Sequence, residues 1–199
     1  AYLRPALERP NLTVETGVLV TKLIVENGRV KGVSYLIDGV AHTAYAESEI
    51  VLSAGAIASC QLLMLSGIGP ADELKAVGVD PIHDLPGVGK DLQDHLNIPI
   101  TFYTKEPLGI GAWTDEVITD SFEEWRDHRT GIRSSPWVAS GGHVCSRPGV
   151  EPDLQLYGAM SPHRDYARFL GGQSGITTHS TLQRPNSRGE IRLRSTNPI

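Results

Sequence analysis

The first part of the chain alternates between β-branched strand patterns and two-residue turn signals. Val18–Glu26 is rich in β-branched residues and runs directly into Asn27-Gly28, a pair that adopts positive φ at little cost. Val30–Ile37 returns to a strand pattern, Asp38-Gly39 repeats the turn chemistry, and Val40–Ala46 alternates again. The pattern predicts a β-meander of three strands.

An apolar run and two helical patterns follow. Glu49–Ser53 is nearly continuous in apolar residues and ends at Ala54-Gly55. An apolar run that ends in small residues before a helix is typical of a buried parallel strand in α/β proteins, so we expect such a strand here. Ligands of α/β proteins bind at the end of such strands. Ile57–Leu65 and Ala71–Val77 have helical patterns, and the glycines and proline that follow them are normal helix terminators.

The remaining residues predict a second lobe beyond Asp84. A helix is expected around Ser121–Arg129, and nothing repeats a strand–helix–strand rhythm, which favours an antiparallel or mixed sheet with helices on one face. The alternating runs that predict its strands are Ile98–Tyr103, Trp137–Cys145, Asp153–Tyr157 and Glu190–Arg194. The predicted fold class is therefore α+β.

Composition narrows the class of protein. The 199 residues are 40% hydrophobic and 21% charged, which excludes a disordered chain, and no apolar run is long enough for a membrane span. Lys and Arg number 18 against 23 Asp and Glu, a formal charge of −5 that argues against nucleic acid as a partner. Two cysteines and no secretory signal favour a reducing compartment, and we expect the cytoplasm.

Common chemical motifs are incomplete. Three Gly-x-Gly pairs begin at Gly67, Gly87 and Gly109, but each lacks the third glycine of a dinucleotide fingerprint, so we interpret them as turns. The seven histidines show no ligand spacing, and no metal site is expected.

Several residues allow two interpretations. The Asp94-His95 pair is either a carboxylate-oriented base or a polar connector, and His143 either faces a cavity or is an ordinary core or surface residue. Cys60 suits a small core side chain better than a reactive thiol. The arginines near the C-terminus form either an ion-paired edge or an anion site; they are Arg184, Arg188, Arg192 and Arg194. Two tryptophans lie beside glycines, Trp113 and Trp137, and they either line a pocket or fill the core.

Four stretches together resemble one enzyme family. SAGAIASCQLLMLSGIGP at 53–70 and LPGVGKDLQDHL at 85–96 strongly resemble the middle of the glucose–methanol–choline (GMC) oxidoreductases, which are FAD-dependent alcohol oxidases and dehydrogenases. The segment 11–35 is similar to the family's meander, and 187–198 to its late substrate-domain strand. Cys60 stands where proline or serine is usual, and Asp91 where asparagine is common.

The resemblance implies a division of labour. Residues 1–84 would form part of an FAD-binding domain that lacks the G-x-G-x-x-G unit, and 85–199 a substrate-binding domain. The backbone of Val20 would bracket the flavin adenine, and Ala54 and Gly55 would let the cofactor approach closely. The family's catalytic histidine has no counterpart in this chain, so no catalytic residue is assigned. We expect this chain alone neither to turn over an alcohol nor to retain FAD.

The resemblance also bears on the substrate, a small-molecule alcohol. Trp137 and Ala139 would belong to the substrate pocket. Choline-specific members carry a carboxylate just before the Gly-Gly of this region, and Ala139 occupies that place before Ser140-Gly141-Gly142. Without that anion a quaternary ammonium ion loses its electrostatic attraction, so we expect an alcohol other than choline.

Three alternatives define what remains to be tested. The leading interpretation is a central segment of a longer GMC enzyme, with apolar surfaces left exposed and a tendency to self-associate. A non-catalytic binding or scaffold module would reuse the same architecture. A self-sufficient small enzyme would rely on His95 or His143. The identity of the alcohol, and the choice between oxidase and dehydrogenase, do not follow from these residues.

Overall fold

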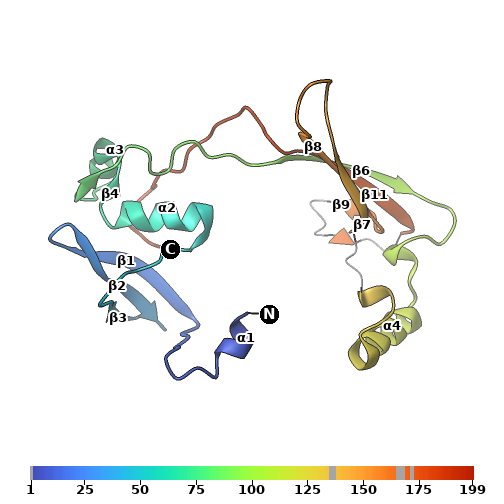
Figure 1. The fold of residues 1–199 in the computed structure, drawn as a ribbon, viewed down its shortest axis with the longest axis horizontal. Coiled ribbons are helices and arrows are strands. Elements are labelled where there is room, and N and C mark those ends of the chain that lie inside the picture. The colour runs from blue at the N-terminus through green and yellow to red at the C-terminus, as the bar shows by residue number, and fades with distance from the viewer. Residues whose placement is uncertain (1, 135–137, 165–168, 171–172) are drawn as a thin grey trace. The chain divides into compact units, whose positions relative to one another are not determined.

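The chain divides into two compact units. The computed structural model describes residues 2–134, 138–164, 169–170 and 173–199. The first unit contains the chain up to Leu92 together with Arg188–Ile199, and the second contains Gln93–Ser187 (Figure 1). The boundary after Leu92 lies eight residues beyond the predicted boundary at 84. The last segment, Arg188–Ile199, was predicted to belong to the second unit but belongs to the first. The assignment of the units to FAD and substrate remains a prediction.

The first unit begins with a short helix and the expected meander. Helix α1 (Leu3–Ala6) precedes strands β1 (Val18–Glu26), β2 (Arg29–Ile37) and β3 (Val40–Tyr45), which form an antiparallel sheet in the order β1-β2-β3. Both turns have the predicted chemistry. Asn27 and Gly28 have φ of 51° and 74°, and Asp38 and Gly39 have 49° and 79°. Positive φ at both central residues matches the right-handed twist of the hairpin strands.

Both predicted helices of this unit are confirmed, but the predicted parallel strand is wrong. Helix α2 (Gly55–Leu65) and helix α3 (Ala71–Ala76) flank β4 (Ile68–Gly69), which pairs in parallel with β5 (His83–Asp84). Glu49–Ser53 forms no strand. A strand needs a neighbour to accept its backbone hydrogen bonds. No described strand pairs with this run, and Val51 is 77% exposed.

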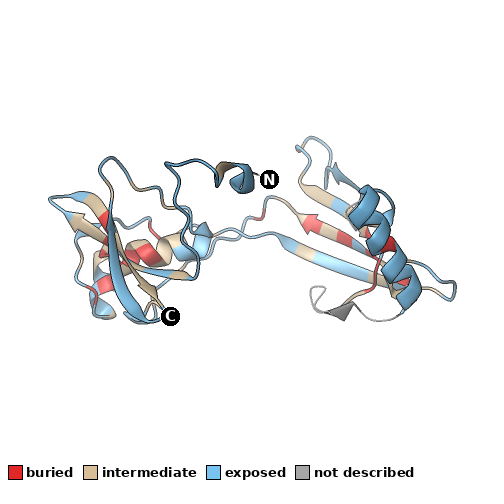
Figure 2. Ribbon diagram, turned by 90° about the horizontal axis from the view of Figure 1, so that it is seen from below, coloured by how far each residue is buried: buried red, intermediate tan, exposed pale blue. Residues whose placement is uncertain are grey.

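The core of the first unit is apolar and includes a buried face of α2, and Figure 2 shows where the chain is buried. Met64, Leu74, Val79 and Val88 form a buried cluster, and Cys60 packs against it as a small hydrophobic side chain. The buried Ser66 hydroxyl joins the helix to the meander, since it donates to the Leu62 carbonyl at 2.6 Å and accepts the Leu23 amide at 2.8 Å.

The last segment of the chain is extended and packs against this core. The predicted strand Glu190–Arg194 is wrong, because only an isolated bridge between Gly189 and Leu92 pairs this region with another segment. Its alternation nevertheless has a structural cause. Ile191 and Leu193 pack against the apolar cluster, and the Ile191 amide donates to the Gly89 carbonyl at 2.7 Å.

The second unit is built on an antiparallel sheet in the order β6-β11-β8-β7, which agrees with the predicted α+β class. The central strand β11 was absent from the sequence prediction. The elements of this unit are β6 (Leu96–Tyr103), η1 (Ile110–Ala112), α4 (Asp115–His128), η2 (Ile132–Ser134), β7 (Val138–Val144), β8 (Leu154–Ala159), β9 (His163–Arg164), β10 (Phe169–Leu170) and β11 (Gly175–Leu182).

Helix α4 begins six residues before the predicted start. Thr114 caps it by accepting the Val117 amide at 3.3 Å, and the acidic Asp115 and Glu116 occupy its first turn. Both features are standard helix-start signals, and the sequence carried them. In the part of the chain that the structure describes, no helix has the length and apolar character needed to cross a membrane.

Candidate functional site

The predicted cofactor residues lie at open positions of the first unit. Val20 is exposed on β1, which is an edge strand of the meander, and a register shift follows between Val20 and Lys22. On an edge strand, half of the backbone amides and carbonyls face away from the sheet. A purine edge could be bracketed by such groups.

Ala54 and Gly55 stand exposed at the N-terminus of α2. Ala54 is the N-cap residue, and no side chain caps the helix. Gly55 has φ of +88°, and a Cβ built on it meets no atom within 4 Å. The open space is compatible with a close-approaching ligand, and the positive φ explains the glycine. These positions therefore fit the role that the family resemblance implies.

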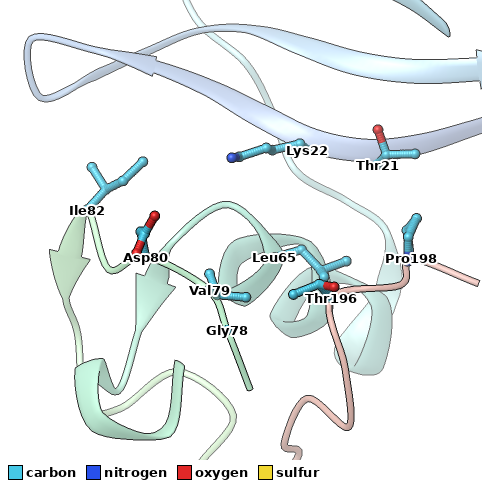
Figure 3. Close-up of a pocket in the computed structure, with 9 residues that line it drawn as sticks. All are labelled: Thr21, Lys22, Leu65, Gly78, Val79, Asp80, Ile82, Thr196 and Pro198. Atoms are coloured by element: carbon cyan, nitrogen blue, oxygen red, sulfur yellow. The ribbon is translucent and has the colours of Figure 1, made fainter. Parts of the chain in front are cut away.

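A cavity of about 400 Å³ lies elsewhere in the first unit (Figure 3). Lys22 from β1 and Asp80 from the loop after α3 bring opposite charges to its walls. Val20, Ala54 and Gly55 do not line it. Its lining residues are Thr21, Lys22, Leu65, Gly78, Val79, Asp80, Ile82, Thr196 and Pro198.

A recess of about 510 Å³ lies on the sheet of the second unit. Its register places Gly141 of β7 opposite Tyr157 of β8, and His143 opposite Gln155. A Cβ built on Gly142 meets no atom within 4 Å, so this residue leaves open space, whereas one on Gly141 would lie 3.1 Å from the Tyr157 Cβ atom. The lining residues are Val138, Ser140, Gly141, Gly142, His143, Gln155 and Tyr157.

A histidine pair extends this polar surface to the next strand. His179 of β11 lies opposite Tyr157, and the two rings are stacked with centroids 4.4 Å apart and 5° between their planes. The Nε2 atom of His179 lies 3.1 Å from Nδ1 of His163 in β9. On its other side, His179 Nδ1 lies 3.1 Å from the Asn97 side-chain nitrogen. Both ring nitrogens of His179 are therefore engaged.

Thr177 anchors the chain that carries His163. Its buried hydroxyl donates to the Ser161 carbonyl at 2.8 Å and accepts the His163 amide at 2.8 Å. The Thr101 hydroxyl lies 3.0 Å from Thr177 Oγ1 and donates to the His163 carbonyl at 3.0 Å. These hydrogen bonds hold the backbone of His163 against the sheet.

Burial favours the neutral form of both histidines. Desolvation lowers the pKa of His179, and the adjacent His163 lowers it further by charge repulsion. Desolvation also lowers the pKa of His163. Neutral imidazoles offer one donor and one acceptor each, so the pair is suited to orienting a hydroxyl group or passing a proton along fixed hydrogen bonds.

The predicted pocket residues are only partly described. Trp137 lies outside the described residues. Ala139 is in β7, at a register irregularity between Val138 and Ser140. Such bulges re-aim side chains and are enriched beside active sites. His143, one of the two histidines singled out earlier, is exposed and lines the recess.

Sequence reasoning missed the most engaged histidines. His163 and His179 belong to no short motif, and their partners Asn97 and Tyr157 lie far away in sequence. One signal was available, because Thr177, His179 and Thr181 recur at every second residue. Their burial shows that polar residues can mark the inner face of a strand.

Other candidates have ordinary roles. The Asp94 carboxylate accepts the backbone amide of His95 at 2.8 Å, and the His95 side chain is exposed, which favours a polar connector. Arg184 pairs with Glu151, and Arg192 pairs with Glu190 at 2.5 Å. Both arginines are therefore ion-paired, Arg184 in the second unit and Arg192 in the first.

Comparison with known proteins identifies the family. Residues 1–97 match the family model described as GMC oxidoreductase. Human mitochondrial choline dehydrogenase is 41% identical over 200 residues, an alignment that covers 100% of this chain and 34% of the relative. The chain belongs to the GMC oxidoreductase family. The predicted family is therefore confirmed.

Further relatives agree with this GMC assignment. Oxygen-dependent choline dehydrogenase of Vibrio vulnificus is 33% identical over 203 residues, covering 100% of this chain and 36% of that protein. A structure of formate oxidase from Aspergillus oryzae shares the fold, with a TM-score of 0.86 and 24% identity over 98% of this chain and 39% of that one. The GMC chain spans about a third of the length of the curated relatives it matches.

Proposed function

We propose that this chain is the central part of an FAD-dependent GMC enzyme that oxidises a small alcohol. The observation that supports this most strongly is the 41% identity to a choline dehydrogenase over the whole chain, so that both compact units are included. This whole-chain similarity to oxidoreductases gives no support to a non-catalytic scaffold module.

In this proposal the first unit holds part of the cofactor. Val20 on the edge strand β1 would present backbone groups to the adenine, and the open positions at Ala54 and Gly55 would admit the cofactor closely. When bound, the flavin supplies the redox chemistry by accepting a hydride from the alcohol carbon at N5. The chain itself contributes position and steric room.

The second unit would contribute a wall of the substrate pocket. The recess presents His143, Gln155 and Tyr157, all able to hydrogen-bond a hydroxyl group. Gly142, at which a Cβ would meet no atom within 4 Å, leaves space for the carbon skeleton. The base that takes the hydroxyl proton is not assigned to any residue of this chain.

The absence of a carboxylate at Ala139 shapes the proposed substrate. A quaternary ammonium ion requires a compensating charge or an aromatic cage when water is displaced. We therefore propose an alcohol other than choline, although the curated relatives include choline dehydrogenases. In the full-length enzyme, Ala139→Glu should raise choline turnover, and Ala139→Gln provides the uncharged control. No gain in kcat/KM for choline with the Glu variant would contradict this substrate assignment.

Flavin content tests the wider proposal. The full-length enzyme should purify yellow, and its flavin absorbance should bleach when the correct alcohol is added without oxygen. The 199-residue chain alone should purify colourless. A full-length protein that binds no flavin and bleaches with no alcohol would refute the oxidoreductase, whereas a yellow short chain would refute only the expectation that FAD is not retained.

A further inference from the structure

The histidine pair of the second unit has a readable direction of hydrogen bonding. The Thr181 hydroxyl donates to the Asn97 carbonyl oxygen, Oδ1, at 3.0 Å. The Asn97 nitrogen lies 3.1 Å from His179 Nδ1 and 3.4 Å from the Tyr157 hydroxyl, and Asn97 Oδ1 lies 3.3 Å from the same Nδ1. The shorter of the two contacts pairs Nδ1 with the amide nitrogen, which only donates, so we assign His179 Nδ1 as the acceptor and place its proton on Nε2.

The same direction continues into His163. With its proton on Nε2, His179 donates across 3.1 Å to His163 Nδ1, which must be unprotonated. His163 then carries its own proton on Nε2. A hydrogen-bond chain therefore runs from Thr181 through Asn97 and His179 to His163, and each tautomer is set by the preceding donor.

We propose that His163 is a positioning residue that fixes His179 as its Nε2–H tautomer and so holds the Tyr157 ring in the wall of the recess. The His163 backbone is anchored by Thr101 and Thr177, so its ring is an acceptor placed by the sheet. His179 stacks on Tyr157 with nearly parallel planes, so its orientation sets that of the tyrosine. The effect on substrate rests on the proposed function, whereas the tautomer is a property of this chain.

The surroundings of His179 are consistent with this arrangement. Among the described residues in contact with its ring, the titratable groups are His163 of β9 and Tyr157 of β8, and Asn97 of β6 is uncharged. No carboxylate is among those partners. A second proton on His163 would set two N–H groups against each other across its 3.1 Å contact with His179, and a second proton on His179 would do so across its 3.1 Å contact with the Asn97 nitrogen.

Nitrogen NMR of the 199-residue chain tests the tautomer directly. The chain is labelled with ¹⁵N-histidine and measured at a pH above the usual histidine pKa. Under these conditions His179 should show a protonated Nε2 and an unprotonated Nδ1. His163→Gln keeps an acceptor oxygen and should preserve this signature. His163→Leu removes the acceptor and should give His179 a mixed tautomer population. His128→Gln, at the exposed end of α4, is the matched control.

The outcomes separate cleanly. A protonated Nδ1 on His179 in the unsubstituted chain would overturn the proposal, as would an unchanged His179 signature in a folded His163→Leu variant. If that variant does not fold, the unsubstituted chain and the Gln variant still decide the tautomer.

Kinetics of the full-length enzyme test the consequence for substrate. His163→Leu should lower kcat/KM about tenfold and His163→Gln should largely restore it, as expected for an outer partner that orients a contact residue. If the NMR signature is as expected and kcat/KM is unchanged in both variants, the assigned tautomer is supported, but the proposed effect of His163 on substrate oxidation is refuted. If the full-length enzyme shows no alcohol oxidation at all, the proposed function fails independently of the tautomer.

Discussion

The two units are stabilised by different kinds of interior. In the first unit, the buried cluster consists of Met64, Leu74, Val79 and Val88. In the described part of the second unit, Ala159 is the one buried hydrophobic residue, and the buried polar residues are Ser121, Ser161, Thr177, His179 and Thr181. One unit is built on apolar packing, and the other on a hydrogen-bonded sheet face.

This difference matters for function. Apolar packing is non-directional and tolerates exchange between side chains of similar volume. A buried polar network fixes donors, acceptors and ring orientations, but each group left unpaired is costly. The second unit is therefore the better place for side chains that must hold one orientation toward a substrate.

The largest expected effect is on the apolar unit. Met64 is 1% exposed, and Met64→Ala should destabilise the first unit by about 2–5 kcal/mol because it opens a cavity in the small core. All three tryptophans belong to the second unit, so their emission should report an unfolding transition close to that of the unsubstituted chain. Amide hydrogen exchange measures the loss of stability in the first unit, as reduced protection of its backbone amides.

Ile57→Ala provides the control for this comparison, since Ile57 lies on the same helix and is 65% exposed. It should cost far less than Met64→Ala. Equal losses of protection in the two variants would mean that the first unit does not depend on its apolar cluster.

The polar unit should respond strongly to loss of its anchor. Thr177→Val keeps the shape of the side chain but removes the hydroxyl that serves Ser161 and His163, and we expect a loss of about 1–3 kcal/mol. Thr178→Val, on the exposed side of the same strand, is the matched control. Tryptophan-monitored urea unfolding measures both, and similar midpoints would break the proposed contrast between the interiors.

Mild acid should destabilise the second unit specifically. The folded pKa values of His163 and His179 lie below the usual value, so below about pH 6.5 the unfolded chain binds more protons than the folded one. Stability should therefore fall as the pH is lowered from 7 through that range. The lowered pKa values of Asp153 and Glu190 act in the same sense only at the more acidic pH of carboxyl titration.

His163→Gln sharpens the acid experiment because it removes one of the two buried imidazoles. Its urea midpoint should depend less on pH between neutrality and mild acid. A steeper dependence than in the unsubstituted chain would show that His163 is not held neutral by burial.

The smallest effect on stability is expected at the open face of the second sheet. Ile98, Ile100 and Phe102 are each about half exposed on the side opposite the buried threonines. Such a patch favours self-association. Ile98→Lys with Ile100→Lys should reduce association in light scattering and change the unfolding free energy by less than about 1 kcal/mol.

Ile132→Lys is the control for this last experiment, because Ile132 is 58% exposed but belongs to η2 and not to the sheet. A strictly monomeric unsubstituted chain at high concentration would remove the case for self-association.

Local chemistry explains which elements were predictable. Asn27-Gly28 and Asp38-Gly39 carry their turn geometry in their own backbones, so the meander followed from the sequence. Helix α2 followed from its apolar run and the glycines after it. Strand β11 did not, because Thr177, His179 and Thr181 bury polar side chains and invert the expected alternation.

Two predicted strands are absent from the structure, and they show why side-chain pattern alone does not determine a strand. Glu49–Ser53 and Glu190–Arg194 have suitable side chains, but a strand also needs a partner for its backbone. No described neighbour pairs with the first run. The second is held by Ile191 and Leu193 against a core instead of by a ladder.

The family resemblance, the meander and the first helices were determined by the sequence itself, because each depends on residues close together in the chain. The site in the second unit was decided by tertiary structure. His163 and His179 lie 16 residues apart, and Asn97 and His179 lie 82 apart. Only the pairing of β6, β8 and β11 brings these groups within hydrogen-bond distance, and a linear pattern does not contain that register.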